Sequence, residues 1–271
     1  MRDSILDRAF RGEVLSGLDI VDAHCHMGPP TEFYAAKADI EEMVEDADRL
    51  GVGRLCVSPH VALSCDHRAG NRLTQEAIWK FPDRVYGLLT LNPNRPDEID
   101  CEFAAYYPSD QFIGVKLHPG SHAYPLTGPS YDAVLERVEA DGGFALVHTW
   151  EADSRCNAAA CEAALQRFPR VPFIFAHALG LRTGAETTVA LVNRYANAYF
   201  DTSGFEFSDT TIEWLMARVD NNKVFFGSDC PYHDLRSGIS RILFADLRDE
   251  LKEKLLGGNF RVLLRQYPKK V

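Results

Sequence analysis

Short apolar segments rich in β-branched and aromatic residues recur eight times along this chain, at intervals of about 25 to 35 residues. A stretch with helical periodicity follows each segment. This interval matches one strand-and-helix unit, so consecutive strands should be parallel and joined by right-handed crossovers. Eight such units predict a closed TIM (β/α)8 barrel. The predicted strands are residues 18–23, 54–58, 85–91, 112–118, 144–148, 172–177, 198–202 and 223–228.

Residues that end helices support this division. Pro82 and Pro169 each follow a predicted helix, and proline cannot continue one. Because no low-complexity linker or short repeat divides the chain, we expect a single domain over residues 1–271. Within it, residues 1–17 should form a helical cover on the underside of the barrel, and residues 257–271 a last helix on its flank. The helices predicted between these segments are residues 40–50, 71–81, 98–106, 131–140, 158–168, 187–195, 211–217 and 239–256.

Composition restricts the kind of partner and the compartment. The formal net charge of −10 disfavours nucleic acid and anionic membranes, because both require a basic face. No apolar run approaches the roughly 18 residues of a membrane span, and residues 1–13 lack the apolar centre of a signal peptide. Seven cysteines without a C-x-x-C pair indicate reduced thiols. We therefore expect a cytoplasmic protein, and the sequence leaves open whether it forms a homo-oligomer.

A pair of histidines near the N-terminus predicts a metal site. His24 and His26 follow the first apolar segment, with Cys25 between them. Alternate side chains of a strand face the same way, so both imidazoles can bind one ion while Cys25 packs on the opposite side. Single histidines are more often hydrogen-bonded core or rim residues, which is our interpretation of His60, His67, His122 and His233. Of these four, His60 and His233 stand where they could also line a pocket.

Further ligand-type residues stand at the ends of later predicted strands. In a barrel of this kind, the carboxyl ends of the strands meet at one mouth, where the chemistry is placed. Imidazoles with one carboxylate suit zinc, with manganese or iron as alternatives, and a divalent ion there would activate water. Asp229 could both bind the ion and accept a proton from that water. The residues concerned are Lys116, His118, His148, His177 and Asp229.

In this ordered set of motifs the chain resembles the amidohydrolase superfamily, in particular its amidohydrolase-related branch of metal-dependent hydrolases with a TIM-barrel fold. The resemblance extends over nearly the whole chain. It implies that His24, His26, His148 and Asp229 bind one ion, and that His177 either binds it or serves as an acid or base. The motifs are Val21-Asp22-Ala23-His24-Cys25-His26, Gly114-Val115-Lys116-Leu117-His118-Pro119, Val147-His148-Thr149, Ala176-His177-Ala178-Leu179-Gly180, Phe200-Asp201-Thr202-Ser203-Gly204, Gly227-Ser228-Asp229-Cys230-Pro231 and Gly258-Asn259-Phe260-Arg261.

The fourth predicted strand differs from that of the binuclear members of this superfamily. Those enzymes often bridge two metals with a carbamylated lysine or a glutamate, and Lys116 lies two residues before His118. We favour one ion over two, because a mononuclear site already suffices to activate water. Lys116 is an alternative ligand. His118 and Lys116 are then available to bind an anionic substrate, together with Trp150 and Tyr232 in the neighbouring loops.

These residues predict a metal-dependent hydrolase that cleaves an amide, lactone or ester bond of a small, anionic molecule. The alternative among enzymes is a nonoxidative decarboxylase of an aromatic or unsaturated carboxylic acid, since the same branch resembles metal-dependent decarboxylases. The alternative outside enzymes is a non-catalytic metal-binding barrel that acts as a binding protein.

Overall fold

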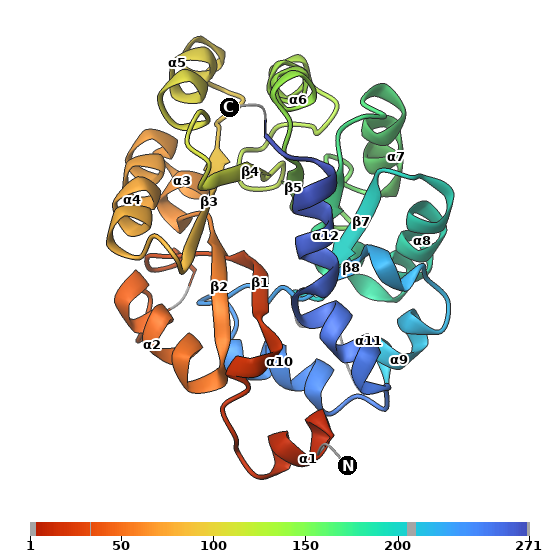
Figure 1. The fold of residues 1–271 in the computed structure, drawn as a ribbon. Coiled ribbons are helices and arrows are strands. Elements are labelled where there is room, and N and C mark those ends of the chain that lie inside the picture. The colour runs from red at the N-terminus through yellow and green to blue at the C-terminus, as the bar shows by residue number, and fades with distance from the viewer. Residues whose placement is uncertain (1–3, 33, 205–209, 270–271) are drawn as a thin grey trace.

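The computed structural model describes residues 4–32, 34–204 and 210–269 and forms a barrel of eight parallel strands (Figure 1). The strands follow one another in chain order around the sheet, and each pairs with the next. The predicted TIM barrel is confirmed, and each strand lies within or close to its predicted segment. The strands are β1 (Ile20–Cys25), β2 (Val52–Val57), β3 (Val85–Thr90), β4 (Phe112–Leu117), β5 (Ala145–Val147), β6 (Phe173–Phe175), β7 (Ala198–Asp201) and β8 (Val224–Phe225).

Backbone hydrogen bonds close the barrel between its last and first strands. The N–H of Ala23 in β1 donates to the carbonyl of Phe226, just after β8, at 2.9 Å. Further on, the N–H of Asp229 donates to the carbonyl of His24 at 2.8 Å. The segment after β8 therefore continues alongside β1 and brings Asp229 next to the histidine pair.

Helices surround the barrel on its outer side, and most begin and end close to the predicted residues. The helices that follow the first seven strands are α2 (Ile40–Leu50), α3 (His60–Ser64), α4 (His67–Lys80), α5 (Pro96–Tyr106), α6 (Pro129–Asp141), α7 (Ala158–Arg167), α8 (Leu181–Arg194) and α9 (Thr211–Met216). Helix α3 was not predicted, because five residues show no readable periodicity. No helix in the described parts of the chain is both long and apolar enough to cross a bilayer.

The helix predicted over residues 239–256 is wrong as a single element. The structure has α10 (Leu235–Leu243) and α11 (Asp249–Glu253), followed by a π-helical turn (Lys254–Gly258). A new helix start explains the break, since Asp249 and Glu250 place two carboxylates in the first turn of α11, where the helix dipole favours them.

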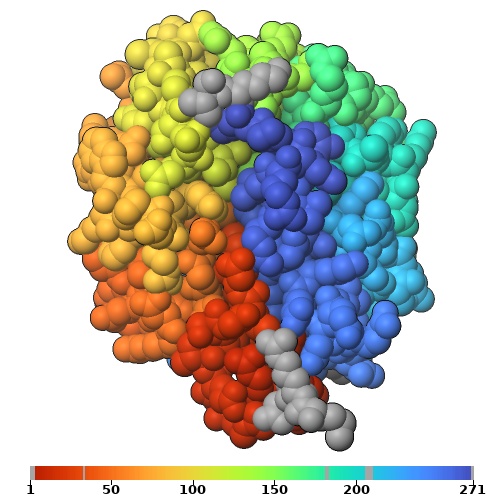
Figure 2. Space-filling view, viewed as in Figure 1, coloured from red at the N-terminus to blue at the C-terminus, as the bar shows by residue number. Residues whose placement is uncertain are grey.

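The two ends of the chain also differ from their predicted places. Helix α12 (Asn259–Gln266) lies across the amino-terminal end of the barrel, where we expected residues 1–17 (Figure 1). The C-terminal part, in blue, fills the centre of this face in Figure 2. Helix α1 (Ile5–Phe10) instead packs beside α10, with the rings of Phe10 and Phe244 5.1 Å apart. The periodicity of a terminal helix predicts which of its faces is apolar. It does not predict which part of the barrel that face covers.

Phe260 anchors α12 in the barrel. Its ring lies 5.6 Å from that of Phe144 and 5.5 Å from that of Phe225, and its side chain is fully buried. Phe260→Ala should lower the free energy of unfolding by about 3–5 kcal/mol, as measured by chemical denaturation. Val262→Ala on the same helix, where the side chain is 40% exposed, should change it by less than about 1 kcal/mol. Equal effects of the two substitutions would contradict this role of Phe260.

Candidate metal centre

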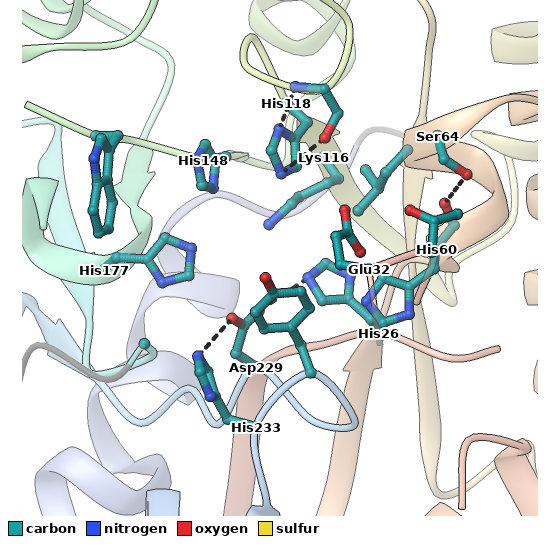
Figure 3. Close-up of a pocket in the computed structure, with 16 residues that line it drawn as sticks. His26, Glu32, His60, Ser64, Lys116, His118, His148, His177, Asp229 and His233 are labelled. Carbon is teal, nitrogen blue, oxygen red and sulfur yellow. Dashed lines mark hydrogen bonds and ion pairs between the residues drawn. The ribbon is translucent and has the colours of Figure 1, made fainter. Parts of the chain in front are cut away.

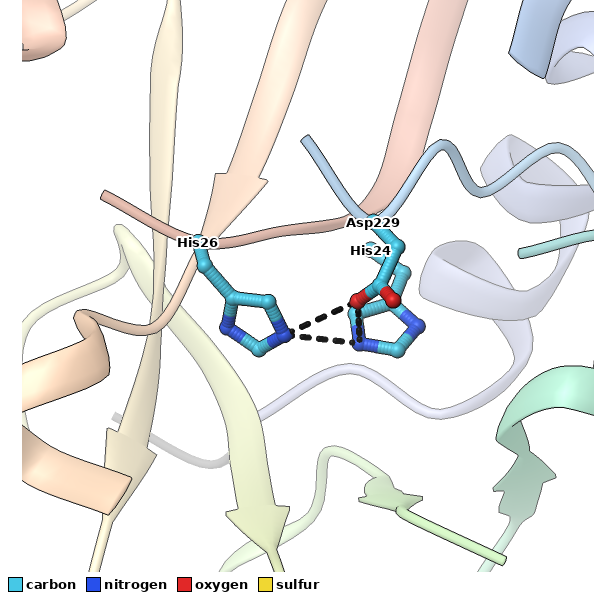
Figure 4. A group of neighbouring side chains, drawn as sticks. All are labelled: His24, His26 and Asp229. Carbon is cyan, nitrogen blue, oxygen red and sulfur yellow. Dashed lines mark hydrogen bonds and ion pairs between the residues drawn. The ribbon is translucent and has the colours of Figure 1, made fainter. Parts of the chain in front are cut away.

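Three side chains converge at the carboxyl end of β1 and β8. The Nε2 atoms of His24 and His26 lie 3.2 Å apart, and Asp229 Oδ1 lies 3.3 Å from the first and 3.1 Å from the second. All three side chains are buried, and their ligand atoms lie within 4.8 Å of one another (Figure 4). Among the described residues they form the single group of three or more potential metal ligands with this spacing. Two imidazole nitrogens and a carboxylate oxygen suit a divalent transition metal.

The backbone around this group is irregular where the ligands stand. The pairing of β1 with β2 shifts its register between Asp22 and Cys25, within the motif that carries the histidines. Asp22 Oδ1 accepts hydrogen bonds from the N–H of His24 at 3.2 Å and of Ser228 at 2.9 Å, which ties the two segments together. Asp229 has a φ of 65°, in the left-handed region that non-glycine residues seldom adopt. Such backbone conformations concentrate at functional sites, where the surrounding structure holds them.

The outer nitrogens of both histidines have partners that fix their tautomers. His26 Nδ1 lies 2.8 Å from the carbonyl oxygen of Ser58, which can only accept, so Nδ1 carries the proton. His24 Nδ1 lies 2.8 Å from Asp201 Oδ2 and donates in the same way. Both Nε2 atoms therefore direct a lone pair toward Asp229, as metal ligation requires. Asp201 thus fixes the orientation of the His24 ring.

The protonation states agree with this geometry. Burial, followed by the nearby Lys116 ammonium, lowers the pKa of His24 to about 3, and burial also lowers the pKa of His26. Burial opposes ionisation of Asp229, but its interactions with His177, His24 and His26 outweigh this and hold its pKa well below the usual range. At neutral pH the cluster therefore consists of two neutral imidazoles and a carboxylate, the forms in which these groups bind metals.

Lys116 in β4 points into the same cluster. Its Nζ donates to His24 Nε2 at 2.6 Å, and the side chain is buried. Burial lowers the pKa of Lys116 to about 8, against the attraction of Asp229 and Asp201. The ammonium uses the same His24 lone pair that a metal would use, so Lys116 must release His24 when the metal binds.

A hydrogen-bond network connects His177 to His24. Ser203 Oγ donates to Asp201 Oδ1 and lies 3.1 Å from His177 Nδ1. Since the hydroxyl has one proton, His177 Nδ1 is the donor to Ser203. Residues 177–179 all have left-handed φ values, so the chain turns sharply after β6 and places the His177 ring 5.4 Å from that of His24.

His148 and His118 form a wall next to the cluster. Their rings stack 3.9 Å apart at 10°, and the His148 ring stands edge-on to His177 at 5.1 Å. His118 Nδ1 accepts from the N–H of Ser121 at 3.1 Å, so the neutral ring carries its proton on Nε2. His148 is not part of the close group of three, although it lines the same pocket.

One pocket of about 320 Å³ opens over these side chains (Figure 3). Every predicted site residue except His24, which lies beneath it, lines this pocket. His60 and His233, for which a place in the pocket was the alternative to a structural role, line it too. His67 and His122 have structural contacts as predicted, with Glu98 at 3.3 Å and the Tyr131 hydroxyl at 2.8 Å. The predicted site residues in the lining are His26, Lys116, His118, His148, Trp150, His177, Asp229 and Tyr232.

Removing the carboxylate behind His24 should weaken metal binding. Asp201→Asn replaces the acceptor of the Nδ1 proton with an amide that can present either an oxygen or an N–H group, so His24 loses its fixed orientation. We expect a 10- to 100-fold loss in metal affinity, on the order found for partners of metal-binding histidines, measured by competition with a chelating dye. Asp83→Asn on the surface should leave the affinity unchanged. Unaltered affinity in Asp201→Asn would show that His24 needs no such support.

Comparison with known proteins is consistent with this geometry. A model of the family described as "Amidohydrolase" matches residues 21–266, nearly the whole barrel. A search of curated proteins found no match. Among solved structures, the chain is similar to 5-carboxyvanillate decarboxylase from Novosphingobium aromaticivorans, which was crystallised with manganese and 4-hydroxy-3-methoxy-5-nitrobenzoic acid. The identity is 13% and the TM-score 0.70, over 93% of this chain and 97% of that one.

Two further solved structures represent other reactions. 4-Oxalomesaconate hydratase from Rhodopseudomonas palustris has 17% identity and a TM-score of 0.63, with 91% of this chain and 96% of that one covered. A probable 2-pyrone-4,6-dicarboxylic acid hydrolase from Acinetobacter baumannii has 17% identity and a TM-score of 0.69, with coverages of 91% and 99%. At these identities the likeness shows a common fold. The family match, together with the ligand cluster at the barrel mouth, identifies the chain as a metal-dependent enzyme of the amidohydrolase family.

Proposed function

We propose that the protein is a hydrolase that cleaves an amide, lactone or ester bond of a small anionic molecule. The observation that carries this proposal is the position of Asp229. One carboxylate oxygen faces the two histidine Nε2 atoms, and the other faces His233 in the pocket at 3.8 Å. A carboxylate that touches the ligand cluster and also reaches the pocket can take a proton from a water molecule held between them.

His24, His26 and Asp229 would hold the divalent ion, with His148 as a further ligand and zinc as the proposed metal. When bound, such an ion activates water and polarises a substrate oxygen. The donor set fits because both histidines direct lone pairs inward while their outer nitrogens are occupied by Ser58 and Asp201. His148 lines the same pocket, with its ring 5.1 Å from that of His177.

The remaining polar residues would bind the substrate and move protons. His177 donates from Nδ1 to Ser203, so in its neutral form Nε2 can accept a proton at the reacting centre or serve as a ligand. The Nε2–H group of His118 and the Lys116 ammonium, once released from His24, can donate to an anionic oxygen. Trp150 and Tyr232 provide aromatic walls for the rest of the molecule.

A nonoxidative decarboxylase is the second candidate. Several solved structures with similar folds are decarboxylases, including 5-carboxyvanillate decarboxylase and 2,6-dihydroxybenzoate decarboxylase from Rhizobium, both with TM-scores of 0.70. In this protein, His118 and Lys116 could hold a substrate carboxylate. A protonated Asp229 could deliver a proton to the carbon atom from which carbon dioxide leaves. That role requires Asp229 to begin the reaction protonated.

A substrate panel separates the two candidates. Protein loaded with zinc or manganese should hydrolyse at least one member of a set of lactones, esters and amides that carry a carboxylate, without release of carbon dioxide. Hydrolysis of lactones and esters is followed with a pH indicator, hydrolysis of amides by the amine released, and carbon dioxide with a coupled carboxylase assay. Carbon dioxide release from aromatic or unsaturated acids, without hydrolysis, would replace the hydrolase proposal with the decarboxylase. Ligand binding without any turnover would favour a binding protein.

A further inference from the structure

The turn that carries His177 has a backbone conformation that its own residues disfavour. His177, Ala178 and Leu179 have φ values of 63°, 45° and 63°, in the left-handed region that residues with a Cβ seldom adopt. Such residues persist only where the surrounding structure holds them in place. In Figure 3 the His177 ring points from this turn toward the centre of the pocket. The contacts that hold the turn therefore also determine where the ring lies.

The side chain of Thr149 provides such contacts on both sides of His177. Its hydroxyl donates to the carbonyl oxygen of Ala176 at 2.5 Å and accepts from the N–H of Leu179 at 3.2 Å. A hydroxyl has one proton and two lone pairs, so both bonds can form together. One side chain thus connects the residue before His177 with the end of the left-handed segment.

Burial makes these two hydrogen bonds hard to replace. Thr149, Ala176 and Leu179 are all completely buried, so water does not reach them in the folded protein. Loss of the hydroxyl would leave a buried carbonyl and a buried N–H without a partner, which is costly. The turn could recover partners only by moving, and His177 would move with it.

The other hydrogen bonds of the turn act at single points. The N–H of His177 donates to Asp201 Oδ1 at 3.3 Å, and its ring lies 3.1 Å from Ser203 Oγ. The carbonyl of Leu179 accepts from the N–H of Glu151 at 2.7 Å. None of these three partners bonds the backbone both before and after His177, as the Thr149 hydroxyl does.

We propose that Thr149 is a positioning residue for His177. Its hydroxyl fixes the left-handed turn and thereby places the imidazole, whose ring lies 5.4 Å from that of His24. Thr149 is buried and does not line the pocket, so it acts through His177 and does not touch a substrate. The inference rests on the proposed function only in that His177 takes part in the reaction.

The ring of His177 reports its own displacement, in metal-free protein and without any substrate. Nitrogen-15 correlation spectra detect the ring nitrogens, and the signals missing in His177→Gln identify His177. In the wild type we expect a proton on Nδ1 that exchanges slowly with water, because it is donated to Ser203. Thr149→Val has the same branched shape without the hydroxyl and should lose this signal. Thr149→Ser, which has the hydroxyl, should keep it.

A second buried threonine provides the matched control. Thr188 lies in α8, the helix that follows the turn, and its buried hydroxyl has no hydrogen-bond partner among the described residues. Thr188→Val should therefore leave the His177 signals unchanged. Should Thr149→Val fail to fold, Thr149→Cys provides the same comparison, because a thiol is only a weak donor and acceptor. Wild-type signals in the folded Thr149 variant, or equal losses in Thr188→Val, would overturn the proposal.

Kinetics separate positioning from a contribution to stability alone. With whichever lactone, ester or amide of the panel is hydrolysed, Thr149→Val should lower kcat about 10- to 100-fold and leave KM nearly unchanged. A displacement of about 1 Å can cost on the order of 100-fold in rate. A residue that only stabilises the fold would lower the free energy of unfolding but leave kcat per folded molecule at the wild-type value, and this result would refute positioning. If no panel member is hydrolysed, the hydrolase proposal fails, whereas the spectra still decide whether Thr149 places His177.

Discussion

Asp229→Asn should abolish turnover while the barrel stays folded. Loss of the proton acceptor alone should reduce kcat by about 100- to 10,000-fold. The new amide would also place an N–H group or an uncharged oxygen where Asp229 Oδ1 now faces both histidine Nε2 atoms, which should weaken metal binding. Steady-state kinetics at saturating metal, with the metal content measured in parallel, separates these two effects.

The fold should tolerate this substitution for a specific reason. Asp229 has a φ of 65°, and asparagine is among the few residues that adopt the left-handed region readily. The free energy of unfolding of the metal-free protein should therefore change by less than about 1 kcal/mol. Asp83→Asn is the control for loss of a carboxylate at the surface and should retain wild-type rates. A wild-type rate in Asp229→Asn with metal bound would remove Asp229 as the proton acceptor.

Removal of the metal should have the second largest effect. Dialysis against a chelator should reduce activity to background, and added zinc or manganese should restore it. Because the three ligand side chains are almost completely buried in the folded chain, the metal binds mainly to the folded state. An ion in about 1,000-fold excess over its Kd should then stabilise the protein by about 4 kcal/mol, measured by chemical denaturation with and without metal.

A ligand variant provides the matched control for this experiment. His26→Gln removes one of the two imidazoles, so its unfolding should respond much less to chelator or to added metal than that of the wild type. Full activity in metal-free protein, verified by elemental analysis, would contradict the proposed mechanism. A metal response that is unchanged in His26→Gln would place the metal at other ligands.

Much of this architecture can be predicted from the chain alone. Eight apolar segments at regular intervals predict the barrel, and this regularity survives even where β8 is reduced to Val224–Phe225. The same pattern predicts that His26, Lys116, His177 and Asp229 meet at one mouth, because the carboxyl ends of parallel strands converge there. This convergence depends on the order and direction of the strands. It changes little with the length of any one strand.

The finer geometry could not be predicted, because it depends on individual hydrogen bonds. A strand pattern does not determine side-chain rotamers. It therefore could not predict that His148 stacks on His118 or that the Lys116 ammonium contacts His24. The position of His60 after the second predicted strand allowed a place in the pocket, but the sequence does not show that its Nδ1 lies 2.8 Å from the carbonyl oxygen of Gly28, 32 residues earlier in the chain.

The left-handed backbone at residues 177–179 limits how this enzyme could be redesigned. Side chains branched at Cβ would be strained in this turn, so mutant libraries aimed at new substrates should leave it untouched. Diversity is better directed at Trp150, Tyr232 and His60, which stand on other segments around the pocket. Selectivity could then be altered separately from the turn that presents His177.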